Sequence, residues 1–120
     1  GAILAFAEAR KNSGSDTGDI DLVMKRSTDG GKTWSGMTMV WDDAENVCGN
    51  PSPVVDSRSG RIILTMTWNN GKDPENKIHA KTSIDTRRVF VTFSDDEGLH
   101  AEFFCYFFGA QVLLHHFFYL

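Results

Sequence analysis

The chain of 120 residues has few of the features that mark several protein classes. It has two cysteines, Cys48 and Cys105, and neither belongs to a Cys-x-x-Cys pair, which argues against a disulfide scaffold, a zinc site and thioredoxin chemistry. The net charge is −4 and the twelve lysines and arginines are scattered. This pattern shows no basic footprint for a nucleic-acid partner and weakens the case for a polybasic membrane patch.

The sequence also has no initiator methionine and no basic segment before an apolar stretch, so it shows no signal peptide. Its first residues, 1–6, are typical of a strand already in progress. We therefore expect the chain to be a piece of a longer protein, for which the missing signal leaves export open.

Sustained helical spacing of apolar residues is absent as well. Short strands separated by polar turns are expected instead, over residues 3–7, 20–26, 33–40, 53–56, 61–68 and 89–94. Polar loops are expected over residues 11–18, 46–52 and 69–75. The chain is therefore predicted to be all-β, as in a sandwich, a barrel or a propeller.

An internal repeat decides among these architectures. Ser27, Asp29, Gly31 and Trp34 fit the pattern S-x-D-x-G-x-x-W, and the same pattern starts again at Ser94, with Ala101 where a second Trp is expected. Each copy follows a predicted strand, which is typical of propeller blades. We expect these residues to be structural: Ser and Asp cap the turn, Gly supplies a positive φ, and Trp packs on the hairpin.

The last residues differ sharply in composition from the rest. Residues 1–99 carry all 12 lysines and arginines and 15 of the 16 acidic residues, whereas residues 100–120 hold eight of the 14 aromatics. We interpret residues 100–120 as an aberrant tail, read in the wrong frame or otherwise non-native. The alternative is an apolar anchor, which is short for a membrane span and lacks flanking positive charge.

The repeat is the Asp box of the sialidase superfamily, and its surroundings resemble the first blades of bacterial exo-α-sialidases. The resemblance runs from about residue 2 to residue 99 and is carried by AFAEAR at 5–10, DTGDIDLV at 16–23, GNPSPVVD at 49–56, TWNNG at 67–71 and DTRR at 85–88. It implies about two blades of a six-bladed β-propeller. It also implies hydrolysis of terminal α-linked sialic acid from glycoconjugates with retention of configuration.

The resemblance assigns roles to four residues, each with an alternative. Asp16 matches the general acid/base, although a solvated loop acid would look the same. Arg10 matches the Arg that reaches the 4-hydroxyl of the sugar, although it could be a surface Arg at a strand end. Asn50 aligns with the position that meets the N-acetyl group, or forms the turn before Pro51. Trp68 either borders the acyl pocket or packs in the core.

Other clusters suggest less. Asp42, Asp43 and Glu45 do not have the spacing of a calcium loop, so a solvated acidic loop is expected. His79 stands alone, and His115 and His116 are adjacent, which is poor spacing for a metal site. No cofactor and no metal are expected. The resemblance implies sialylated glycans as partners and a secreted or periplasmic parent.

Several parts of the family pattern are missing from the chain. The R-I-P segment with the first carboxylate-binding Arg, the other two clamp Arg residues, the Tyr nucleophile and its Glu are absent, and Tyr106 and Tyr119 lie in the tail. We therefore expect the isolated chain to be unstable and inactive, with the activity belonging to its parent. A trans-sialidase, or a non-catalytic Asp-box propeller that binds carbohydrate or protein, remains the alternative.

Overall fold

The computed structural model describes the backbone of residues 1–107 and 110–112 and the side chains of residues 1–101. These residues form eight strands and one short helix: β1 (Ile3–Arg10), β2 (Ile20–Ser27), β3 (Thr38–Trp41), β4 (Val47–Val55), β5 (Ile62–Asn69), α1 (Glu75–His79), β6 (Arg88–Ser94), β7 (Glu102–Phe107) and β8 (Ala110–Val112). The all-β prediction is confirmed. Within the described residues no helix is long and apolar enough to cross a membrane.

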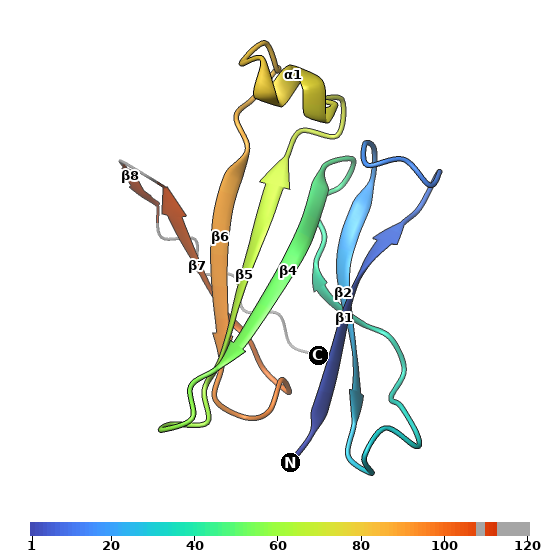
Figure 1. Ribbon diagram of the computed structural model, residues 1–120, viewed down its shortest axis with the longest axis vertical. Helices are drawn as coiled ribbons and strands as arrows, with labels where there is room; N and C mark the ends of the chain where they lie inside the picture. Colours follow the sequence, from blue (N-terminus) through green and yellow to red (C-terminus); the bar gives the residue numbers. More distant parts are fainter. Residues whose placement is uncertain (108–109, 113–120) are drawn as a thin grey trace.

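The strands form two antiparallel groups that meet at one point (Figure 1). The first group is β1-β2-β3 and the second is β4-β5-β6-β7-β8. The register between the groups is a single parallel pair, Ile20 with Val47. Figure 1 shows the two groups diverging from each other away from that pair, as adjacent blades of an open propeller do.

The two groups repeat each other in register. Ile3 on β1 pairs with Ser27 on β2, and Ile62 on β5 pairs with Ser94 on β6, so each Asp-box serine faces the first residue of the preceding strand. The loops at the opposite strand ends, residues 11–19 and 70–87, lie together at one end of the molecule with α1 (Figure 1). In each repeat the Asp box therefore lies at one end of the strands, called the Asp-box end here. The loops 11–19 and 70–87 lie at the other end, called the loop end.

The hydrophobic core is formed by side chains of these strands, and on β5 every second residue contributes to it. Leu64, Met66 and Trp68 are buried, whereas Thr65 between them is exposed. Leu22 on β2 and Cys48 on β4, both fully buried, complete the cluster. Further apolar side chains pack against it from neighbouring strands: Phe6, Val40, Trp41 and Phe90.

Both Asp boxes hold their turns through the same hydrogen bonds. Ser27 Oγ donates to Asp29 and accepts the Gly31 N–H at 2.9 Å, and Asp29 Oδ1 accepts the Thr33 N–H at 2.9 Å. In the second box Ser94 Oγ accepts the N–H of Gly98 at 3.0 Å. Positive φ angles of 86° at Gly31 and 83° at Gly98 let the turn close.

The first Asp box keeps its tryptophan on the turn but shortens the strand that follows. Trp34 donates its indole N–H to the Gly31 carbonyl at 3.1 Å, and its side chain is 41% exposed. The strand expected over residues 33–40 begins only at Thr38. The reason is that hydrogen bonds from residues 31, 33 and 34 back to the box keep this stretch in the turn.

One further expectation was wrong, and one segment without a prediction forms a helix. The loop expected over residues 46–52 is the first half of β4, and its irregularity is absorbed by a register shift between Gly49 and Ser52. The polar loop expected over residues 69–75 leads into α1, whose first turn is closed by the Lys77 N–H on the Pro74 carbonyl at 3.0 Å. Neither feature has a periodic apolar signal.

The start of the aromatic tail takes part in the sheet. β7 pairs antiparallel with β6, with Phe90 opposite Cys105 and Phe93 opposite Glu102. The remaining tail residues named in the sequence analysis, including His115, His116 and Tyr119, lie outside the described residues. A non-native origin of residues 100–120 stays a prediction.

Candidate functional site

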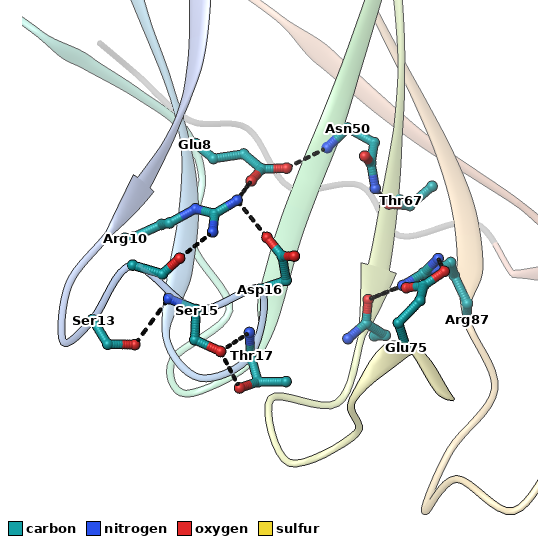
Figure 2. A network of polar contacts seen from close by, with 12 residues as sticks. Glu8, Arg10, Ser13, Ser15, Asp16, Thr17, Asn50, Thr67, Glu75 and Arg87 are labelled. Atoms are coloured by element: carbon teal, nitrogen blue, oxygen red, sulfur yellow. Dashed lines mark hydrogen bonds and ion pairs between the residues drawn. The ribbon is translucent and has the colours of Figure 1, made fainter. Parts of the chain in front are cut away.

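Polar side chains from both strand groups gather at the loop end of the molecule (Figure 2). β1 contributes Glu8 and Arg10, and the following loop contributes Asp16. β4 contributes Asn50, and β5 contributes Thr67. The structure thus brings together three of the four residues that the resemblance singled out, Arg10, Asp16 and Asn50, with partners that join them.

Arg10 is the centre of the first half of this site. Its Nη2 lies 2.7 Å from Asp16 Oδ1 and 3.0 Å from Glu8 Oε2, and its Nη1 donates to the Gly14 carbonyl at 2.8 Å. The hydrogen bonds to Asp16 and then Glu8 raise the pKa of Arg10. The guanidinium therefore stays charged. It holds the loop through two acceptors of that loop, the Asp16 carboxylate and the Gly14 carbonyl.

Asp16 is presented to solvent on a turn held by local hydrogen bonds. Its side chain is 84% exposed although one oxygen contacts Arg10. The flanking residues stabilise the turn locally: the Ser15 N–H donates to Ser13 Oγ at 3.1 Å, and the Thr17 N–H donates to Ser15 Oγ at 3.2 Å. Such side-chain-to-backbone bonds fix a loop without burying it. The carboxylate is thus held in place and still accessible to a ligand.

Glu8 connects Arg10 with Asn50. Its second oxygen, Oε1, accepts the Asn50 N–H at 2.9 Å, and the Asn50 side-chain amide donates to Thr67 Oγ1 at 2.7 Å. Asn50 lies within β4 rather than in a turn, and its positive φ of 51° falls at the register shift between Gly49 and Ser52. Gly49 makes the contact possible, because a Cβ there would lie 2.4 Å from Glu8 Oε1.

The second half of the site lies on the ends of β5 and β6. Arg87 binds both oxygens of Glu75, at 2.6 Å and 3.1 Å, and also donates to the buried Asn69 side chain. The hydrogen bond from Arg87 lowers the pKa of Glu75. Asp73, 1% exposed, accepts the N–H groups of Ile84 and Asp85 at 2.7 Å and 3.0 Å, which closes the loop that carries this pair.

Trp68 is placed apart from these residues. Neighbouring residues of a strand point to opposite faces, so Trp68 faces away from Thr67 and into the core, where it is 8% exposed. Its indole N–H donates to Asp43 Oδ2 at 2.6 Å, and the Arg88 guanidinium stacks 4.7 Å from its ring centre. The structure does not bring Trp68 together with Arg10 and Asp16.

Three acidic residues beside this site, Asp19, Asp21 and Asp42, form ion pairs with one lysine. Lys11 Nζ lies 2.8 Å from Asp21 Oδ2, 3.1 Å from Asp19 Oδ1 and 3.7 Å from Asp42 Oδ2. Burial raises the pKa of Asp21, and the hydrogen bonds to Asp21 and Asp19 raise the pKa of Lys11. Among residues 1–101 no group of three or more His, Cys, Asp or Glu side chains is arranged to hold a metal ion.

Sequence reasoning did not single out several of the residues found here: Glu8, Thr67, Asn69, Glu75 and Arg87. A signal existed for three of them. Glu8 lies two residues before Arg10, and Thr67 and Asn69 flank Trp68, so strand alternation places them on one face. The register also makes Glu8 equivalent to Thr67, and Arg10 to Asn69, in the two repeats. The Glu75–Arg87 pair had no sequence signal, because it depends on how the loop folds back.

Comparison with known proteins identifies a matching family and similar proteins. The sequence pattern of the BNR repeat-like domain family matches residues 1–115. An exo-alpha-sialidase of Aspergillus fumigatus is 36% identical over 115 residues, covering 82% of this chain and 28% of the relative. A sialidase of Clostridium perfringens is 38% identical over 109 residues, covering 82% of this chain and 26% of the relative.

A solved structure shares the fold. The Hadza microbial sialidase Hz136 superposes with a TM-score of 0.64 at 24% identity, over 81% of this chain and 22% of the sialidase chain. The two strand groups described above are therefore part of a sialidase-type β-propeller fold. The chain spans only about a quarter of the length of the relatives that it matches.

Proposed function

The chain belongs to the family of BNR repeat-like domains, and from this premise we propose that it is part of an exo-α-sialidase. The parent protein would hydrolyse terminal α-linked sialic acid from glycoproteins, glycolipids or oligosaccharides, with retention of configuration. The sialidase names of relatives from a fungus and a clostridium support this proposal. The substrate is sialylated glycan in general, with no preference among linkages assigned.

The contact between Arg10 and Asp16 is the observation that carries this proposal. A scaffold needs its Asp boxes for stability, but it does not need an exposed carboxylate held 2.7 Å from an arginine at the loop end. The rigid β1 strand supplies the arginine, and the short loop after it supplies the acid. We assign Asp16 as the general acid/base and Arg10 as a ligand of the sugar hydroxyls.

The chemistry follows from these two groups. Asp16 in its acid form would protonate the leaving glycosidic oxygen, and its carboxylate would then activate the water that completes hydrolysis. Sialidases use a Tyr nucleophile, an exception to the two-carboxylate glycosidases. A neutral nucleophile suits this substrate because an anionic one would be repelled by the carboxylate beside the anomeric carbon. We assign that Tyr, its Glu and the clamp arginines to other parts of a six-bladed parent.

Asn50 and Trp68 would act around this centre in different ways. Asn50, exposed at the loop end and joined to Arg10 through Glu8, is assigned to the N-acetyl group of the sugar. Trp68 contacts Asp43 and the core, so its place supports the alternative role in packing over a direct role at the acyl group.

The experiment compares two leaving groups in the full-length parent. Asp16→Asn removes the proton donor and keeps the size of the side chain, and we expect kcat/KM for methyl α-sialoside to fall by about 10²- to 10⁴-fold. The 4-nitrophenyl α-sialoside needs little protonation of its leaving group, so its cleavage should fall much less. Glu45→Gln, an exposed carboxylate-to-amide change in a neighbouring loop, is the matched control. Equal losses on both substrates would contradict the assignment of Asp16.

The extent of the propeller part is a separate proposal. We assign residues 1–99 to the sialidase propeller and residues 100–120 to a tail of different origin, on the basis of their composition. Sequencing the encoding DNA across codon 99 tests this. A one-base shift that restores Thr-Trp-Ser after Leu99 is the expected result, and an unchanged reading frame would contradict it.

A further inference from the structure

We propose that Gly71 is a positioning residue for Asp16: it locks the loop that carries the acid against two other loops. This inference rests on the proposed role of Asp16. The hydrogen bonds of Gly71 go to Gly18 and Asn46, and not to Arg10 or Asp16 themselves. Gly71 is buried at the loop end, two residues after the last residue of β5, where the loops 11–19, 42–46 and 70–87 meet.

The backbone of Gly71 joins all three loops. Its carbonyl accepts the N–H of Gly18, two residues after Asp16, at 2.8 Å. Its own N–H donates to Asn46 Oδ1 at 3.2 Å. The Asp16 loop thus has an anchor on β1 through Arg10 and a second anchor on the other strand group through Gly71. With both anchors, the position of the acid depends on how the two blades meet.

Only a glycine fits at this junction. A Cβ at position 71 would lie 1.8 Å from the backbone oxygen of Glu45 and 3.1 Å from the carbonyl oxygen of Gly18. Both obstacles are backbone atoms, which cannot rotate away as a flexible side chain can. Any larger residue must therefore displace the Asp16 loop, the Glu45 loop or both.

The junction is tied to the core by a chain of hydrogen bonds. Asn46 donates its side-chain amide to Asp43 Oδ2 at 2.9 Å, and the same oxygen accepts the Trp68 indole N–H at 2.6 Å. Asp43 therefore links the buried Trp68 to Asn46. The Asn46 side chain in turn accepts the Gly71 N–H, and the Gly71 carbonyl accepts the Gly18 N–H. This gives Trp68 an indirect connection to the acid although it faces the opposite side of the sheet.

The test uses Gly71→Ala and Asn46→Ala in the full-length parent, with Gly36→Ala as the matched control. An added Cβ at Gly36 meets nothing within 4 Å. We measure kcat/KM for methyl α-sialoside and for 4-nitrophenyl α-sialoside and take their ratio. Misplacing an acid by about 1 Å can cost roughly 100-fold, so Gly71→Ala should shift the ratio about tenfold or more against the methyl substrate. Asn46→Ala should shift it in the same direction by less, and Gly36→Ala should leave it unchanged.

The ratio separates positioning from folding. A variant that is merely less folded loses activity on both substrates equally, because only the amount of active protein changes. If Gly71→Ala does not fold, Asn46→Ala decides, since it removes the support of Gly71 without adding any atom. An unchanged ratio in the folded variants would overturn the inference about Gly71. If Asp16→Asn also leaves the ratio unchanged, the proposed role of Asp16 fails instead.

Discussion

Replacing Trp68 with Phe tests the energetic link between the core and the loop end. Trp68 is 8% exposed, and its indole N–H lies 2.6 Å from Asp43 Oδ2. Phenylalanine keeps an aromatic ring in the core beside Leu64 and Met66 but cannot donate this hydrogen bond. The variant therefore removes one polar interaction from a largely apolar position.

The expected cost can be worked from this geometry. A hydrogen bond to a charged group contributes about 1.5–3 kcal/mol. Asp43 keeps the Asn46 amide at 2.9 Å, so its carboxylate is not left without a donor, which favours the lower half of that range. The smaller ring adds a cavity cost of roughly 1 kcal/mol. We expect Trp68→Phe to lower the free energy of unfolding by about 2.5–3 kcal/mol in total.

The assay is urea unfolding of the full-length parent, with the midpoint compared at constant m-value. Trp34→Phe is the matched control, because Trp34 is 41% exposed and its indole donates only to a neutral carbonyl. It should cost about 1 kcal/mol or less. A double-mutant cycle with Asp43→Ala should give a coupling of about 1–2 kcal/mol. A Trp68→Phe variant as stable as the Trp34→Phe control would refute the reasoning.

Two further predictions concern the Asp box and the isolated chain. Hydrogen bonds, first from Thr33 and then from Ser27, lower the pKa of Asp29 from 3.8 to about 2. Because the folded state favours the ionised form, this stabilisation is complete above about pH 4 and is lost as the pH falls toward 2. The difference in unfolding midpoint between the parent and its Asp29→Asn variant should therefore shrink over that window, and a constant difference would contradict the assignment. The 120-residue chain alone should aggregate and melt without cooperativity, since among the described strands β1 pairs only with β2, and Val54 and Val55 are 60% and 62% exposed. Size-exclusion chromatography with thermal scanning checks this, and a cooperatively melting monomer would disprove it.

Local chemistry made much of the fold predictable. The Asp-box turn is stabilised by hydrogen bonds between residues a few positions apart. Ser27, Asp29 and Gly31 therefore determine it independently of the rest of the chain. The strand predicted over residues 61–68 likewise matches β5, in which Leu64 and Met66 are buried. These features depend on neighbours in sequence, which is the range over which sequence patterns carry information.

The missed features depend on distant residues. β4 looks like a loop because it contains Gly49, Asn50 and two prolines, and its place in the sheet depends on pairing with β5 and on Glu8 reaching over Gly49. The resemblance named Arg10 and Asp16, whereas their mutual contact follows from the folding of the loop between them. The sequence alone does not determine the face on which Trp68 lies, because either face of a strand can be buried until its partner sheet is known.

The shared register of the two repeats has a consequence for how such a protein can change. In the strand pairs β1–β2 and β5–β6, the Asp-box serine pairs with the first residue of the preceding strand in the same way. The loops at the other ends of these pairs, residues 11–19 and 70–87, nevertheless differ twofold in length. Lengthening a flexible loop costs little closure entropy, about 0.6 kcal/mol for each doubling. The blade thus tolerates new sequence at one end while the other keeps the strands aligned. An engineer could graft segments of different length between β5 and β6, provided that Gly71, Asp73 and the Glu75–Arg87 pair keep their places.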